Sequence, residues 1–218
     1  MLVTFTVNGT AGNDTISLDI SGSNVVITLN AAPQLMSDAT VTDIVINGLA
    51  GNDTIDITRN SNNPTTINGG DNDDTIRISP TNQLLSQVTA AVGVNGNNGT
   101  DLLIFTDNSN LTGASYTITS TSAATAGMGT VLYGTTENFT LSASNGPDTI
   151  NLNSSAAGTF YFLNPNDGND IVNVGVAGSP GNIVGSILAG GGNQDDTINL
   201  EATSASATVT VLGNDGND

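Results

Sequence analysis

The residues of this chain that could do chemistry are aspartates that recur within one short polar turn. The stretch AGNDTISL at residues 11–18 returns as AGNDTIDI at residues 50–57, and shorter pieces of it recur down the chain. Aligned on the last aspartate of the turn, eight anchors share this context: Asp14, Asp53, Asp74, Asp101, Asp148, Asp170, Asp196 and Asp218. They are separated by 39, 21, 27, 47, 22, 26 and 22 residues, and five of these seven intervals have the size of a solenoid repeat.

An aspartate at one fixed place in every repeat predicts a cation site. If the repeats stack as coils about 4.8 Å apart, equivalent carboxylates repel each other by about 1 kcal/mol in water-like surroundings. A turn without metal is the alternative, because Asn, Asp and Gly accept left-handed backbone conformations, but it leaves the shared aspartate unexplained. Calcium fits best, since it takes about six to eight oxygen ligands at flexible geometry.

Composition excludes several other classes of function. The 218 residues include 20 acidic and two basic residues, a net charge of -18, and neither cysteine nor histidine. The charge repels nucleic acid and anionic membranes, and the missing residue types exclude thiolate or imidazole metal sites and Ser-His-Asp catalysis. No run of about 18 apolar residues occurs, so we expect no membrane insertion.

Alternating strands must position these turns. An apolar residue, usually followed by Asn and Gly, stands seven positions before each anchor, and the copy at Asp196 is expected to carry one extra residue. After each anchor, a Thr-apolar-x-apolar pattern places two apolar side chains on one face of a strand. The expected inward pairs are Ile16/Leu18, Ile55/Ile57, Ile76/Ile78, Leu103/Phe105, Ile150/Leu152, Val172/Val174 and Ile198/Leu200.

These patterns predict an all-β fold, a parallel β-solenoid with one Gly/Asn/Asp-rich turn per coil. A two-layer sandwich is the competing fold, but sandwiches do not usually repeat one turn sequence. We expect a single domain over 1–218, a segment of a longer repeat array, with hairpin-like insertions at 19–43 and 106–136.

The turns resemble the calcium-binding nonapeptide repeat of the repeats-in-toxin (hemolysin-type) family, as in GLAGNDTID at 48–56 and GGDNDDTIR at 69–77. The spacing of 21 to 27 residues is similar to that of the longer, one-edged calcium solenoids of large bacterial surface proteins. The resemblance implies several Ca²⁺ ions held by the aspartates and turn carbonyls of successive coils. Besides the eight anchors, the candidate metal-site residues are Asp73, Asp195, Gly12, Gly51, Gly69, Gly96, Gly99, Gly168, Gly213 and Gly216.

The expected function is structural: a calcium-stiffened stalk, spacer or fibre segment of a secreted or cell-surface bacterial protein such as an adhesin, with possible end-to-end self-association. A solenoid face that binds ice or carbohydrate is the alternative. A polysaccharide-active enzyme is less expected, because the turns account for most carboxylates and only Arg59 and Arg77 could serve as basic catalytic groups. We therefore predict no enzymatic activity.

Overall fold

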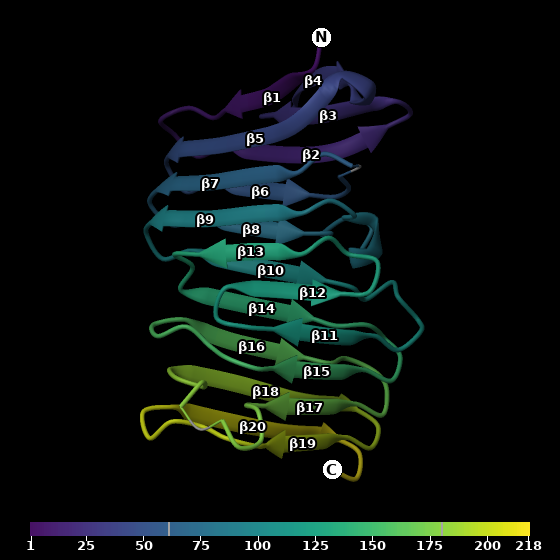
Figure 1. Cartoon of the computed structure of the whole chain (residues 1–218), viewed down its shortest axis with the longest axis vertical. Helices are drawn as coiled ribbons and strands as arrows, with labels where there is room; N and C mark the ends of the chain where they lie inside the picture. Colours follow the sequence, from purple (N-terminus) through teal and green to yellow (C-terminus); the bar gives the residue numbers. More distant parts are fainter. Residues whose placement is uncertain (61, 180) are drawn as a thin grey trace.

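The computed structural model describes residues 1–60, 62–179 and 181–218, and it is an all-β protein built from two ten-stranded sheets (Figure 1). We call them sheet A and sheet B. The chain alternates between them, and one strand of each sheet together form what we call a rung. Most neighbouring strands pair in parallel, so the predicted all-β class with parallel strands is confirmed, and the pairing is not that of an antiparallel sandwich.

Sheet A contains, in spatial order, β1 (Val3–Asn8), β5 (Val41–Ala50), β7 (Thr65–Asp71), β9 (Val92–Asn98), β13 (Val131–Gly134), β12 (Ser122–Thr125), β11 (Ser115–Ile118), β15 (Thr149–Leu152), β17 (Ile171–Val174) and β19 (Thr197–Leu200). Sheet B contains, in spatial order, β20 (Thr208–Asp215), β18 (Ser186–Asn193), β16 (Phe160–Asn164), β14 (Asn138–Ser142), β10 (Leu102–Thr106), β8 (Thr75–Ile78), β6 (Thr54–Ile57), β2 (Thr15–Ser21), β3 (Asn24–Leu29) and β4 (Ala32–Ser37). Two short 3-10 helices, η1 (Asp38–Thr40) and η2 (Leu85–Gln87), lie in connections. Among the described residues, no helix is long and apolar enough to cross a membrane.

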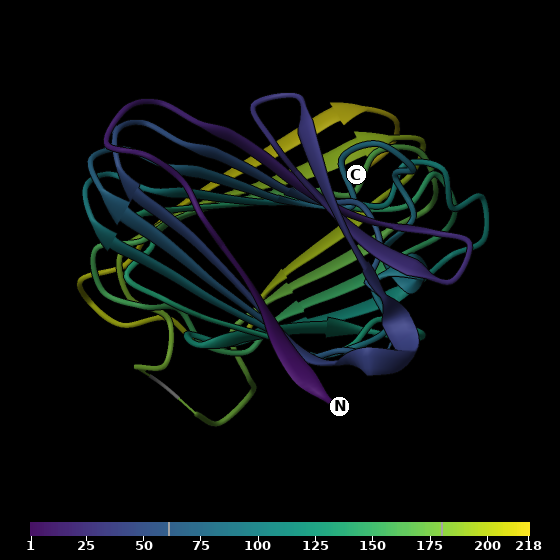
Figure 2. The ribbon, with the colours of Figure 1, turned by 90° about the horizontal axis from the view of Figure 1, so that it is seen from above.

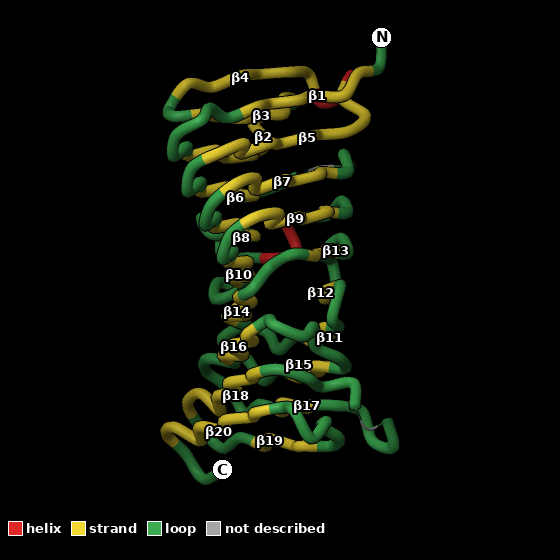
Figure 3. Tube along the Cα trace, turned by 90° about the vertical axis from the view of Figure 1, so that its left-hand side faces the viewer, coloured by secondary structure: helices red, strands yellow, loops and turns green. Residues whose placement is uncertain are grey.

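The core lies between the two sheets, which stand as separate walls when the molecule is viewed from its side (Figure 3). Six of the seven predicted inward pairs are fully buried, and they stack in register from rung to rung. The seventh prediction is wrong at Leu200, which is 55% exposed on β19, the last strand of sheet A. In the middle of the stack, Phe139 packs between Phe105 and Tyr161, with ring centroids 5.2 and 5.3 Å away.

The segment 19–43 extends sheet B beyond the first rung. β2 pairs with β3 around Gly22, whose φ of +61° suits the tight turn, and β3 pairs with β4, both antiparallel. The sequence SGSN at residues 21–24 lies at this β2–β3 connection, within the insertion predicted to be hairpin-like.

The segment 106–136 inserts extra strands into sheet A. β11 continues the parallel stack toward β15, β13 continues it toward β9, and β12 lies antiparallel between them. Three strands of sheet A are therefore used before the chain returns to sheet B at β14.

This segment changes which sheet precedes the polar turn. In the first four rungs the strand before the turn lies in sheet A (β1, β5, β7, β9), whereas afterwards it lies in sheet B (β14, β16, β18, β20). In Figure 1 the arrows of β5, β7 and β9 point left and those of β14, β16 and β18 point right. The connections gather at the two opposite edges of the sheets (Figure 2), so the polar turns move from one edge to the other.

Candidate metal sites

The first column of aspartates lies at the edge where sheet A passes to sheet B. Its members are Asp14, Asp53, Asp74 and Asp101, and each is at most 3% exposed. The backbone N–H of each of the first three donates to Oδ1 of the aspartate one rung later, at 2.7 to 2.8 Å. At the end of the column, the N–H of Asp101 donates to Oε2 of Glu137 at 2.8 Å, so a glutamate closes it.

The second column lies at the opposite edge and contains Asp148, Asp170, Asp196 and Asp218. The same N–H to Oδ1 bonds join successive members at 2.7, 2.8 and 3.1 Å. Asp218, the last member, is exposed. The expectation of a one-edged array is wrong, because the 47-residue interval between Asp101 and Asp148 does not stack these two residues but separates the columns.

The second carboxylate oxygen has no hydrogen-bond donor at five of the eight anchors. These oxygens are Oδ2 of Asp53, Asp74, Asp101, Asp170 and Asp196, all buried. A carboxylate removed from water costs several kcal/mol unless its oxygens find donors or a positive charge. In each of these carboxylates, Oδ1 accepts the N–H of the neighbouring anchor, and we call this series of N–H to Oδ1 bonds the ladder. Oδ2 is available to a ligand.

Glycine five positions before the anchor opens the space beside this oxygen. A Cβ added at Gly48 would stand 2.3 Å from Oδ2 of Asp53 and 2.3 Å from the carbonyl oxygen of Gly69, one rung on. The arrangement recurs at Gly69, Gly96, Gly191 and Gly9. A carboxylate oxygen of one rung and a carbonyl oxygen of the next thus face the same point, which only glycine leaves clear of a side chain.

The turns that follow these glycines need left-handed backbone. Gly51, Gly99, Gly168 and Gly216 stand two positions before an anchor and have φ between +111° and +148°, a region that side chains disfavour. Gly12 holds the same position before Asp14 without a positive φ.

Burial and like charge raise the pKa of Asp74 in the first column and of Asp170 in the second. Burial first, then the charges of Asp101, Asp53 and Asp73, raise the pKa of Asp74 to about 6 against the hydrogen bond from the Asp53 N–H. Burial also leads in raising the pKa of Asp170 to about 7, with the charges of its neighbours in the column adding to it.

Other predicted residues lie outside the buried columns. Asp73 and Asp195 are exposed and accept N–H bonds from the next rung, at Thr100 (2.8 Å) and Asn217 (2.9 Å), so they link rungs on the outer side of the turn. The extra residue expected near Asp196 is absent: Ala189, seven positions before the anchor, pairs with both Leu163 and Val211.

Four residues at these sites are not among those predicted from the sequence: Gly9, Gly48, Gly191 and Glu137. The first two belong to the apolar-Asn-Gly pattern and could have been included on that signal. Glu137 has no such signal, because only Thr135 and Thr136 separate it from β13 and the turn lacks glycine.

Oxygen is the available ligand atom throughout. Among the described residues, no three acidic side chains converge on one point that could hold a metal ion. A bound cation would therefore meet one carboxylate and mainly carbonyl oxygens at each turn, a donor set that suits Ca²⁺ better than Zn²⁺.

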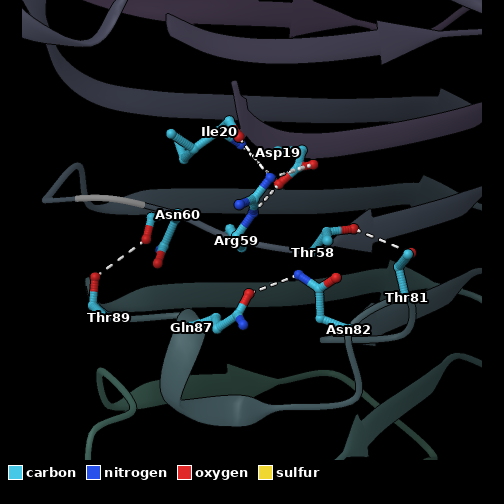
Figure 4. Close-up of polar contacts among 9 residues, drawn as sticks. All are labelled: Asp19, Ile20, Thr58, Arg59, Asn60, Thr81, Asn82, Gln87 and Thr89. Atoms are coloured by element: carbon cyan, nitrogen blue, oxygen red, sulfur yellow. Dashed lines mark hydrogen bonds and ion pairs between the residues drawn. The ribbon is translucent and has the colours of Figure 1, made fainter. Parts of the chain in front are cut away.

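The edge opposite the first column carries different chemistry (Figure 4). Nε and Nη2 of Arg59 bind both carboxylate oxygens of Asp19 at 2.6 and 3.0 Å, and Nη2 also donates to the Ile20 carbonyl. The chain's other basic residue, Arg77, binds Asp56 of the neighbouring strand at 2.6 Å through both nitrogens. Both arginines thus join adjacent strands of sheet B or their connections.

No protein-family model, curated protein or solved structure matches this chain in sequence or fold comparison.

Proposed function

We propose that this chain is a calcium-stabilised β-solenoid with a structural role, as a stalk, spacer or fibre segment of a secreted or cell-surface bacterial protein. The observation that carries the proposal is the set of five buried carboxylate oxygens without donors, arranged at equivalent turns. Ca²⁺ between adjacent rungs would give each of them a positive partner.

Protonation alone would not neutralise the buried carboxylates near neutral pH. With a pKa of about 6, Asp74 is ionised at pH 7.5, and Asp170, with a pKa of about 7, is largely so. The remaining negative charge lies in turns whose carboxylate and carbonyl oxygens are hard ligands, which favour a hard divalent cation.

The arrangement of rungs supports the mechanical part of the proposal. Each rung pairs with its neighbours along the long axis of the molecule, so ions between rungs would join consecutive units of a rod (Figure 1). End-to-end self-association belongs to the proposal, because β19 and β20 each end a sheet and strand edges pair readily.

The small number of charged ligands per turn agrees with an extracellular location. Calcium sites of extracellular modules bind with dissociation constants of about 10⁻⁴ to 10⁻³ M. Such sites stay empty at the low calcium of cytosol and fill outside the cell. A non-enzymatic role is supported by the two arginines, which are both held in ion pairs with aspartates.

Calcium-dependent stability tests the proposal. Thermal unfolding, followed by circular dichroism at pH 8, is compared in chelator, in 10 mM CaCl₂ and in 10 mM MgCl₂. If five sites each contribute about 1.4 kcal/mol at ten times their dissociation constant, we expect calcium to raise the midpoint by about 15 °C or more, and magnesium to act weakly. Identical midpoints in chelator and calcium would contradict the metal part of the proposal.

A further inference from the structure

The first turn of each column differs from the turns that follow it. At Asp14, Oδ2 accepts the backbone N–H of Thr10 at 2.5 Å and its hydroxyl at 3.0 Å. At Asp148, Oδ2 accepts the backbone N–H of Ser144 at 2.9 Å, and the Ser144 hydroxyl donates to Oδ1 at 2.5 Å. The oxygen that lacks a donor in the later turns is therefore already satisfied in these two.

Backbone conformation four positions before the anchor explains the difference. At the five anchors with an unpartnered oxygen this position has a positive φ, between +71° and +126°, and is held by Leu49, Gly70, Asn97, Asn166 and Gly192. Thr10 and Ser144 are outside the left-handed region, which a β-branched residue such as threonine disfavours. In the left-handed turns the N–H faces elsewhere, as at Asn97, where it donates to the hydroxyl of Thr135.

The two insertions supply the remaining donor to these first aspartates. Oδ1 of Asp14, in the first described rung, accepts a 2.5 Å bond from Asn30, which lies in the 19–43 segment. Oδ1 of Asp148 accepts the N–H of Ala114, in the 106–136 segment, at 2.7 Å. Each column thus begins on a carboxylate whose two oxygens are both hydrogen-bonded.

We propose that Thr10 and Ser144 take the place of a cation at the first turn of each column. Calcium then binds at Asp53, Asp74, Asp101, Asp170 and Asp196 but not at Asp14 or Asp148. The inference rests on the proposed function, and its reason is electrostatic. At both turns an N–H presents positive charge at the Oδ2 that an ion would bind, and a hydroxyl donates to the same carboxylate, so these bonds would have to be displaced.

Calcium stoichiometry of matched Asp→Asn variants tests this assignment. The full-length chain and each variant are checked for a native circular dichroism spectrum in 10 mM CaCl₂, and bound ions are counted by equilibrium dialysis. We expect Asp53→Asn and Asp170→Asn each to lose one ion per chain, and Asp14→Asn and Asp148→Asn to lose none. The members of each pair differ by one rung in the same column.

A loss of one ion in Asp14→Asn or Asp148→Asn, equal to that in their partners, would overturn the inference while leaving the proposed function intact. A wild-type chain that binds no calcium would contradict the proposed function itself.

The converse substitution does not depend on removing an aspartate. Thr10→Gly installs the residue type found at Gly70 and Gly192, beside a Gly9 that already leaves the space open. We expect this variant to gain one calcium ion per chain. An unchanged number of bound calcium ions in a folded Thr10→Gly chain would show that Thr10 does not take the place of a cation.

Discussion

The two columns build the same ladder with different turn residues. In the first column, glycine stands five positions before every anchor, whereas in the second column this position is Ala143, Pro165, Gly191 and Gly213. The N–H to Oδ1 bond forms in both, at 2.7 to 3.1 Å. Glycine is therefore not needed for the ladder. In the first column its presence has a steric reason, because an added Cβ would collide with Oδ2 of the anchor and with a carbonyl oxygen of the next rung.

The largest expected effect is a loss of calcium-dependent stability when the anchors of one column are replaced. One variant carries Asp53→Asn, Asp74→Asn and Asp101→Asn, and a second carries Asp170→Asn and Asp196→Asn. At calcium ten times the dissociation constant, we expect the calcium-dependent gain in the free energy of unfolding to fall by about 4 kcal/mol in the first and about 3 kcal/mol in the second. Urea unfolding with and without CaCl₂ measures both.

The exposed Asp43→Asn, outside both columns, is the control for charge removal. If either set of substitutions alone abolished the whole calcium effect, the columns would not be independent.

A side chain added beside Oδ2 of an anchor should lower the free energy of unfolding by nearly as much. In Gly48→Ala the new Cβ would stand 2.3 Å from the backbone carbonyl oxygen of Gly69, which cannot move without disturbing the next rung. We expect a loss of about 3 kcal/mol in the free energy of unfolding, measured in urea. Gly93→Ala, on the same sheet with no atom near the added Cβ, should be close to neutral, and equal effects would refute the steric argument.

The stability of the metal-free chain should depend on pH through one aspartate of each column, Asp74 in the first and Asp170 in the second. Because the pKa values of Asp74 and Asp170 are raised from 3.8 to about 6 and about 7, the folded state holds more protons than the unfolded state between about pH 4 and pH 7. Stability is thus greatest at the acidic side of this window and is lost as pH rises through 6 and 7.

We expect a fall of about 2 kcal/mol in the free energy of unfolding between pH 6 and pH 8 in chelator. Asp74→Asn should remove the smaller part of this fall, which ends just above pH 6, and Asp170→Asn the larger part, which ends just above pH 7. A stability that increased with pH over this range would mean that these carboxylates are charged and well solvated in the fold.

The smallest expected effect is the loss of stability when the hydroxyl of Thr10 or Ser144, beside the first anchor of each column, is removed. Burial acts to raise the pKa of Asp14, but hydrogen bonds from Thr10 and Asn30 outweigh it and lower the pKa, whereas burial prevails at Asp148 and the pKa is raised. Ser144 is fully buried and Thr10 is exposed. We expect Ser144→Ala to cost about 2 kcal/mol and Thr10→Val about 1 kcal/mol in urea unfolding.

Thr66→Val, at an exposed threonine of β7, controls for the hydroxyl itself. A larger effect at Thr10 than at Ser144 would reverse the order that burial predicts.

Local pattern was sufficient to predict the strands and the anchors. The Thr-apolar-x-apolar runs place Ile55 and Ile57 in the core because alternation decides which side chains face inward, and the turn residues locate Asp53 between two strands. The hairpin after β2 also follows from local sequence, through Gly22.

The change of edge could not be read from the sequence, because strands of both sheets share one pattern. β14 resembles β5 in its position before an anchor, yet it lies in sheet B, since three strands of the 106–136 segment were placed in sheet A first. The extra residue predicted near Asp196 is wrong for a separate reason: Ala189 is small where other copies have a larger apolar residue, so its place in the core is not evident from the sequence.

The aspartate ladder runs in one direction along the chain. Every anchor except Asp218 donates its N–H to a carboxylate that comes 21 to 39 residues later in the chain. A turn that has just formed therefore stays incomplete until the following rung exists. A chain that becomes available from its N-terminus would add rungs one at a time, each locking the one before it, and a pause in delivery would leave a single unfinished turn at the growing end.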